Sequence, residues 1–162
     1  MAQLKEKLVT ETIIPFFNLS STKGGSISTW DFKQRKNLVI YFFGGIDCAP
    51  CRETLKKFAD NYYNYRRLNT EVLAIGTDSL ANLSGLAREL NLPFPLLSDA
   101  DAKTANKYTY INPETNLPYP SIFVADKYGS LEEEWIAKDE SGLPAQEKVL
   151  ALLELLELRC PE

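Results

Sequence analysis

Apolar and polar residues follow one another along the chain in blocks that predict strands and helices in alternation. Residues 38–43 (LVIYFF) are continuously apolar and mostly β-branched or aromatic, which is typical of a strand buried on both faces of a sheet. Gly44 and Gly45 break this strand, and apolar residues then recur at helical spacing at Leu55, Phe58, Ala59 and Tyr62. The pattern predicts a strand that is followed by a helix within a few residues.

The same alternation continues toward the C-terminus. The predicted elements are a strand over 71–76, a helix over 80–90 capped by Asp78 or Ser79, an extended segment over 93–97, a small helix around 102–108, a β-hairpin over 122–136 and a leucine-rich helix over 149–158 entered through Pro144. The last helix has an apolar side wide enough to need a sheet face or a partner. Repeated β-α units predict a mostly parallel sheet covered by helices.

Composition narrows the class of protein. The 162 residues are 44% hydrophobic and 25% charged, and no repeat or long linker interrupts them, so we expect one soluble globular domain over residues 1–162. With a formal charge of -4, we expect no basic surface of the kind that binds nucleic acid or anionic lipid. The longest near-apolar run, residues 38–46, is far shorter than the roughly 20 residues needed to cross a bilayer.

Two further features of the sequence limit chemistry and compartment. Histidine is absent, which excludes Ser-His-Asp and Cys-His relays, His-ligated zinc and an imidazole base. Residues 1–11 alternate in charge and lack the apolar core of a signal peptide. The chain as written is expected in the cytoplasm, and outside it if an export signal has been removed.

A Cys-x-x-Cys motif, Cys48-Ala49-Pro50-Cys51, falls at the strand-to-helix junction. Backbone N–H groups and the dipole at a helix start stabilise a thiolate, and a second sulfur one turn later can close a disulfide. The alternatives are a zinc half-site and two inert buried thiols. Zinc needs four N or S ligands and the chain adds just Cys160, so we predict no metal. The motif favours a redox-active dithiol.

Beyond this motif, several segments resemble the alkyl hydroperoxide reductase/thiol-specific antioxidant branch of the thioredoxin superfamily. They are residues 15–19 (PFFNL), 30–33 (WDFK), 41–43 (YFF), 92–99 (LPFPLLSD) and 120–126 (PSIFVAD), together with the cysteine motif. The likeness covers most of the chain. It implies an α/β, thioredoxin-like fold with a central mixed, mostly parallel sheet and helices on both faces.

Peroxiredoxins of this branch carry a Pro after the aromatic strand end, a Thr three residues before the peroxidatic Cys, and a distant Arg that holds its thiolate. With the spacing kept, the Pro corresponds to Gly44, the Thr to Cys48 and the peroxidatic Cys to Cys51. The Arg would fall at or beside Pro120, where the chain has none, so only the peroxidatic Cys is kept here. The chain therefore resembles true peroxiredoxins less than it resembles the other group of the branch.

That other group, the thioredoxin-like thiol-disulfide oxidoreductases, carries a Pro inside Cys-x-x-Cys and a cis-Pro before a later strand. Pro50 and Pro120 occupy the matching positions. The chain departs from this group as well, because Asp47 replaces an aromatic residue, and its charge should raise the pKa of the Cys48 thiol. The group's proton-managing Glu, three residues after the second Cys, corresponds to Thr54.

Our first interpretation is a thiol-disulfide oxidoreductase. Cys48 attacks a substrate disulfide and Cys51 resolves the mixed disulfide. Pro120 and Pro50 shape the substrate groove, and Asp47 and Arg52 are candidate modulators of the thiol pKa, Arg52 alternatively being a solvated helix residue. The disulfide itself would be the redox group, with no other cofactor. The expected partners are a protein or small-molecule disulfide and a dithiol that supplies or accepts electrons.

Two other interpretations remain open. In a thiol peroxidase, Cys51 would attack peroxide and the sulfenic acid would condense with Cys48 or Cys160. In a non-catalytic thioredoxin-like module, the groove would bind a partner or sense redox state through the disulfide.

Overall fold

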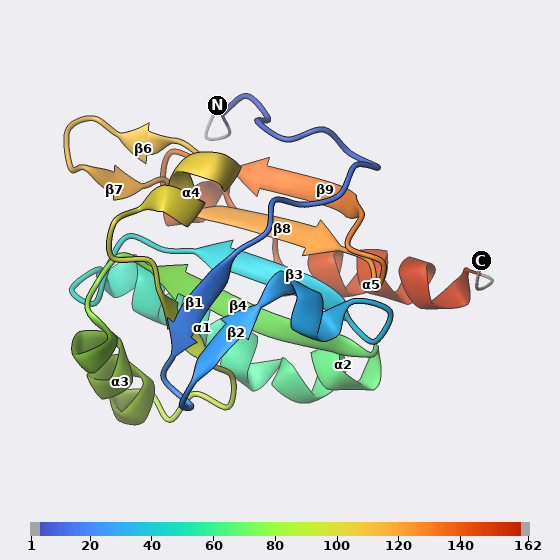
Figure 1. Cartoon of the computed structure of the whole chain (residues 1–162), viewed down its shortest axis with the longest axis horizontal. Coiled ribbons are helices and arrows are strands. Elements are labelled where there is room, and N and C mark those ends of the chain that lie inside the picture. The colour runs from blue at the N-terminus through green and yellow to red at the C-terminus, as the bar shows by residue number, and fades with distance from the viewer. Residues whose placement is uncertain (1–3, 160–162) are drawn as a thin grey trace.

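The computed structural model describes residues 4–159, and its centre is one mixed sheet in the strand order β2-β1-β5-β4-β3-β8-β9 (Figure 1). The strands are β1 (Asn18–Ser21), β2 (Ser26–Ser28), β3 (Asn37–Phe42), β4 (Thr70–Gly76), β5 (Leu96–Ser98), β8 (Ser121–Ala125) and β9 (Leu131–Ile136). A separate small ribbon pairs β6 (Ile111–Asn112) with β7 (Leu117–Pro118). The strand predicted over 38–43 is β3, and it lies near the middle of the sheet.

The thioredoxin-like α/β class with a mixed sheet is confirmed, but the sheet is not mostly parallel. Parallel pairing is confined to β3 with β4 and β4 with β5. The pairs β1-β2, β1-β5, β3-β8 and β8-β9 are antiparallel. For the hairpins β1-β2 and β8-β9, which add strands at both edges of the sheet, the physical reason is that a connection of a few residues can only return the chain antiparallel.

Helices cover both faces of this sheet. They are α1 (Ala49–Asp60), α2 (Tyr62–Arg67), α3 (Leu80–Glu89), α4 (Lys103–Tyr108) and α5 (Gln146–Leu158), with single 3-10 turns η1 (Thr29–Phe32) and η2 (Glu140–Gly142). Alternate residues of β3 divide between two cores: Val39 and Tyr41 pack with α1, α2, α3 and α5, whereas Ile40 and Phe42 pack with α4. Both sets are fully buried, as expected for a central strand.

Several predicted boundaries shift in the structure. The helix after the cysteines is interrupted at Asn61, which is the C-cap residue of α1 and the N-cap residue of α2. Ser79, not Asp78, caps α3, its side chain accepting a hydrogen bond from the Asn82 amide. The leucine-rich helix begins earlier, at Gln146, and packs on the sheet through a buried stripe that includes Leu153. Val149, Leu153 and Leu156 of this helix are buried in the core, whereas Leu155 and Leu158 are exposed.

The outer edge of β9 is covered by the N-terminal segment, which Figure 1 shows running beside it. The amide of Leu4 donates to the Ile136 carbonyl, and the Leu131 amide donates to the Thr12 carbonyl. The segment therefore satisfies backbone groups that a sheet edge would otherwise expose. Among residues 4–159, no helix is long and apolar enough to cross a membrane.

Candidate active site

The two cysteines of the motif lie where β3 ends and α1 begins. Gly45 has a φ of +147°, a conformation that favours glycine, and this allows the chain to turn sharply out of the strand. The turn is held from β4's side by Asp78, whose Oδ2 accepts a hydrogen bond of 3.0 Å from the Ile46 amide. The predicted break at Gly44 and Gly45 is confirmed, and it delivers Cys48 to the start of a helix.

Cys48 and Cys51 form a disulfide across the first turn of α1, with their Cα atoms 5.2 Å apart. Cys48 is the N-cap residue, and its Sγ accepts a hydrogen bond of 3.1 Å from the Cys51 amide. The two sulfur-bearing residues differ in exposure, because Cys48 is half-buried whereas Cys51 is 2% exposed. The Cys51 Sγ also accepts a hydrogen bond of 3.4 Å from the Gly44 amide. Cys48 is therefore the outer sulfur of the pair and Cys51 the inner one.

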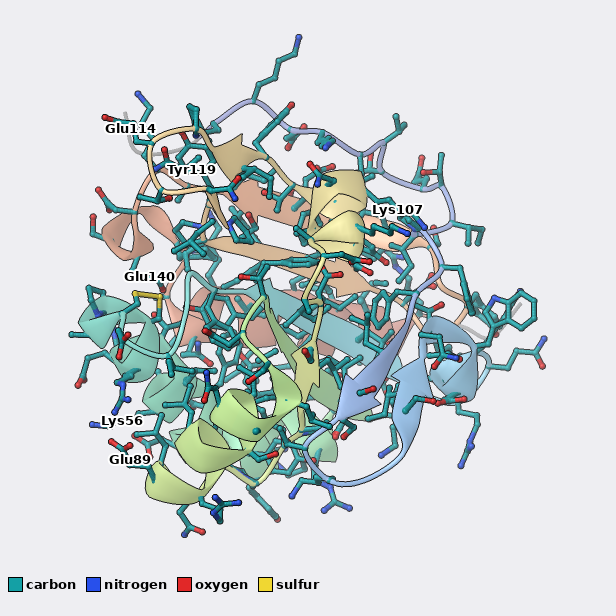
Figure 2. All side chains as sticks on the ribbon, turned by 60° about the vertical axis from the view of Figure 1, so that its left-hand side comes forward. Lys56, Glu89, Lys107, Glu114, Tyr119 and Glu140 are labelled. Atoms are coloured by element: carbon teal, nitrogen blue, oxygen red, sulfur yellow. A yellow bond between two sulfur atoms is a disulfide. The ribbon has the colours of Figure 1, made fainter. Side chains whose placement is uncertain are left out.

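Glu140 brings a carboxylate to the inner sulfur. Its Oε2 lies 3.4 Å from Cys51 Sγ, and Figure 2 shows Glu140 beside the yellow bond of the disulfide. Its other oxygen, Oε1, accepts hydrogen bonds from the Tyr41 hydroxyl at 2.7 Å and from the Thr54 hydroxyl at 2.6 Å. The carboxylate is thus held by one oxygen while the other faces the sulfur.

Burial and neighbours set the ionisation of this group. Loss of solvent raises the pKa of Glu140 above its ordinary value, and the Asp139 charge adds to that. The hydroxyls of Thr54 and Tyr41 and the Lys57 ammonium act in the opposite direction. The pKa of Tyr41 is raised mainly by burial and also by Glu140, so Tyr41 keeps its proton and donates a hydrogen bond to Glu140.

Two cavities border Glu140. One, of about 480 Å³, is lined by residues that include Pro50, Glu53 and Lys57 of α1. The other, of about 490 Å³, reaches along η2 to the start of α5. Both are lined by Thr54, Lys57, Glu140 and Ser141. Glu140 therefore contacts the buried sulfur and also borders space open to solvent.

The candidate pKa modulators lie apart from the sulfurs or make contacts elsewhere. The Arg52 Nε donates a hydrogen bond of 2.8 Å to the Ile46 carbonyl, and its guanidinium forms an ion pair with Glu89 of α3. Asp47 is exposed, next to Cys48 in the loop. No lysine or arginine among residues 4–159 forms a hydrogen bond with either sulfur.

The expected cis-Pro is not found. Among the described residues no peptide bond is cis, so Pro120 follows a trans bond, and this expectation is wrong. The Pro120 carbonyl accepts a hydrogen bond from the Ala137 amide, and Ser121 pairs with Phe42, which places Pro120 at the end of the sheet where β3 leads to the cysteines. Its assignment to a substrate groove stays a prediction. Pro50 does line the cavity beside Glu140. Cys160 lies outside the described residues.

Glu140 is the site residue that sequence reasoning misses. The expected position for a carboxylate, three residues after Cys51, is Thr54, and the structure uses Thr54 to hold Glu140 instead. Glu140 follows the β8-β9 hairpin, and nothing in the residues around it marks it as a neighbour of the motif. Only the strand order, which puts that hairpin beside β3, could have suggested it.

Comparison with known sequences identifies a matching family and several relatives. A model of the AhpC/TSA family matches residues 10–134. Chloroplastic peroxiredoxin Q of Triticum aestivum is 29% identical over 127 residues, which are 78% of this chain and 58% of the relative. A putative peroxiredoxin bcp of Coxiella burnetii is 27% identical over 129 residues, 80% of each chain. The matched region thus spans less than two thirds of the plant relative.

Comparison with solved structures supports the fold. AhpC of Enterococcus faecalis superposes with a TM-score of 0.83 over 94% of this chain and 98% of its own, at 19% identity. Peroxidoxin BcpB of Mycobacterium tuberculosis gives a TM-score of 0.78 over 93% and 98%, at 18% identity. The sheet and helices described above are therefore those of peroxiredoxin structures.

Proposed function

The chain belongs to the AhpC/TSA family, and from this membership we propose that it is a thiol-based oxidoreductase whose Cys48/Cys51 pair cycles between dithiol and disulfide. The observation that carries the proposal is the asymmetry of the pair: an outer sulfur at a helix start and an inner sulfur that is 2% exposed. The pair itself stores two electrons, so no further cofactor enters the proposal.

In the proposed reaction, the Cys48 thiolate attacks a substrate disulfide and expels one substrate thiolate. The Cys51 sulfur then attacks Cys48 in the mixed disulfide, closes the Cys48-Cys51 bond and releases the second substrate thiol. Helix-start N–H groups favour the thiolate at Cys48, because they lie at the positive end of the α1 dipole. The substrate class is a protein or small-molecule disulfide, and a dithiol partner restores or removes the electrons.

The second candidate is a thiol peroxidase with Cys51 as the attacking sulfur, and the names of the relatives favour it. Its product is the same Cys48-Cys51 disulfide, formed when a Cys51 sulfenic acid condenses with Cys48. The local geometry argues for the disulfide substrate instead. A peroxidatic thiolate is stabilised by hydrogen-bond donors or a cation. The Gly44 amide supplies one donor to Cys51, but the charged side chain in contact with Cys51 is the carboxylate of Glu140, which opposes a thiolate there.

Parallel assays on the reduced protein and its Cys→Ser variants separate these candidates. Insulin reduction with dithiothreitol measures disulfide turnover, and stopped-flow mixing with hydrogen peroxide measures peroxide reduction. We expect insulin turnover that is lost in Cys48→Ser and Cys51→Ser and kept in Cys160→Ser, with peroxide reacting no faster than with free cysteine.

Fast peroxide consumption that survives in Cys48→Ser but not in Cys51→Ser would instead establish the peroxidase. If the protein turns over neither substrate, both catalytic candidates fail and a redox-sensing or binding module is left.

A further inference from the structure

We propose that Glu140 is the proton acceptor and donor for Cys51 during closure and opening of the disulfide. The inference deepens the proposed thiol-disulfide function and rests on it. It concerns a residue that lies 89 positions from Cys51 in the sequence and on a different element, η2.

The two carboxylate oxygens of Glu140 make different contacts. Oε1 accepts both available hydroxyl hydrogen bonds, from Tyr41 of β3 and Thr54 of α1. These bonds fix the plane of the carboxylate and leave Oε2 pointing at Cys51 Sγ, 3.4 Å away. In the reduced protein this is hydrogen-bond distance for an S–H donor, so the proton can pass without rearrangement of the carboxylate.

The buried Cys51 thiol needs a neighbouring group that can take its proton. Cys51 is 2% exposed, so its thiol cannot transfer its proton directly to bulk water. Glu140 is half-buried and lines the two cavities described above, so the residue whose carboxylate contacts the sulfur also borders solvent-accessible space. A proton taken from Cys51 can therefore leave through Glu140.

The proposed step combines one proton transfer with one exchange of S–S bonds. Cys51 S–H gives its proton to the Glu140 carboxylate, and the resulting thiolate attacks Cys48 Sγ in the mixed disulfide. The Cys48-Cys51 bond forms, the bond from Cys48 to the substrate sulfur breaks, and the substrate leaves as a thiolate. Glu140 ends protonated and returns the proton to solvent, or to Cys51 when the disulfide is reduced again.

The groups around Glu140 tune this exchange from each packed element. Tyr41 faces it from β3, Thr54 and Lys57 from α1, and Asp139 precedes it at the start of η2. Burial is the largest influence and raises the pKa of Glu140, which brings the carboxyl group nearer to a thiol in proton affinity. A carboxyl with this shift exchanges a proton with a thiol more readily than an exposed one does.

The test uses 5,5′-dithiobis(2-nitrobenzoate) as a limiting disulfide in a Cys160→Ser background. Attack by Cys48 releases one coloured thionitrobenzoate, and attack by Cys51 on the mixed disulfide releases the second, so stopped-flow absorbance resolves the two steps. Glu140→Gln is compared with Glu53→Gln, a matched change on the exposed face of α1 that also borders a cavity.

We expect Glu140→Gln to leave the first phase within about twofold of the parent and to slow the second at least tenfold near pH 6. Its second phase should then rise about tenfold for each unit of pH, because hydroxide must replace the carboxylate, whereas the parent's rises less steeply. Glu53→Gln should behave as the parent does. Glu140→Asp, which keeps an acid, should recover part of the second phase, and it serves if Glu140→Gln does not fold.

Two results would overturn the inference while leaving the proposed function in place: a second phase in Glu140→Gln with the parent's rate and pH profile, or an equal loss in Glu53→Gln. Failure of the proposed function is recognised without any change at Glu140. The parent would then release no second thionitrobenzoate, or Cys48→Ser would keep the parent's first phase.

Discussion

Glu140 Oε2 lies 3.4 Å from Cys51 Sγ, although the two residues are 89 positions apart in the chain. The contact exists because β8 pairs with β3 and β9 returns beside β8, so the residues after β9 reach the helix that follows β3. A buried sulfur thereby acquires a carboxylate from the far end of the sequence.

Removal of the Tyr41 hydroxyl should shift the pH dependence of disulfide closure. Tyr41→Phe keeps the ring in the core but deletes the hydrogen bond that lowers the pKa of Glu140. The pKa of Glu140 should rise, so the second thionitrobenzoate phase should need a higher pH to reach half its maximal rate. The measurement is the stopped-flow pH profile, and an unchanged midpoint would show that this hydroxyl does not control Glu140.

Asp47 should slow the reaction of Cys48. Its exposed carboxylate lies next to Cys48 in the chain, and a like charge disfavours the thiolate. Asp47→Asn should speed alkylation of Cys48 at mildly acidic pH by roughly two- to threefold at low salt, and less at 1 M salt, where the screening length is about 3 Å. Asp60→Asn, an exposed change at the end of α1, is the control and should have no effect.

Two glycine replacements should change stability in opposite directions. Gly45→Ala places a side chain at a φ of +147° and 3.4 Å from Asp78 Oδ2, so it should lower the free energy of unfolding by about 1–3 kcal/mol. Gly85 lies inside α3, and a Cβ there meets nothing within 4 Å. Gly85→Ala should therefore raise the free energy of unfolding by roughly 0.5–1 kcal/mol. Urea unfolding measures both, and equal effects would contradict the structural difference between the two sites.

Glu134 should make stability fall as pH rises above its ordinary pKa of 4.5. Its Oε1 accepts hydrogen bonds from the Lys7 and Leu8 amides, and among residues 4–159 its buried Oε2 has no partner. Burial raises the folded-state pKa, so the folded protein holds a proton that the unfolded chain releases, and this stabilisation is lost as pH rises through the folded pKa.

Glu134→Gln has no such proton to lose. Its stability relative to the parent should therefore grow on going from about pH 4.5 to neutral pH. Thermal unfolding across that range measures the difference. Glu114→Gln, on an exposed loop, should track the parent at every pH, and the same flat comparison for Glu134→Gln would refute the prediction.

Much of the fold follows from local pattern, because continuous β-branched runs and helical spacing mark buried strands and amphipathic helices. Residues 38–43 and the hairpin over 122–136 are examples, and both appear in the structure. The β1-β2 hairpin does not follow from local pattern, since its short polar strands carry no alternating apolar signal. Strand direction is not visible in the local pattern either, so β-α alternation predicts more parallel pairing than the sheet contains.

The candidate site is likewise only partly predictable from the sequence. The disulfide partners, Cys48 and Cys51, can be predicted because their chemistry is set by neighbours within one helical turn. Glu140 cannot, because its role depends on strand order and on the hydroxyls of Tyr41 and Thr54. The cis-Pro expected at Pro120 fails because it was carried over from family resemblance and no local residue pattern requires it.

Alkylation of the fully reduced protein with iodoacetamide at mildly acidic pH, followed by peptide mapping, tests most directly whether Cys48 is the nucleophile of the pair. Only a thiol that is both accessible and low in pKa reacts quickly under these conditions. We predict that Cys48 is labelled first and that Cys51, 2% exposed and facing a carboxylate, is protected. Faster labelling of Cys51 than of Cys48 would contradict this and establish the peroxidase arrangement in its place.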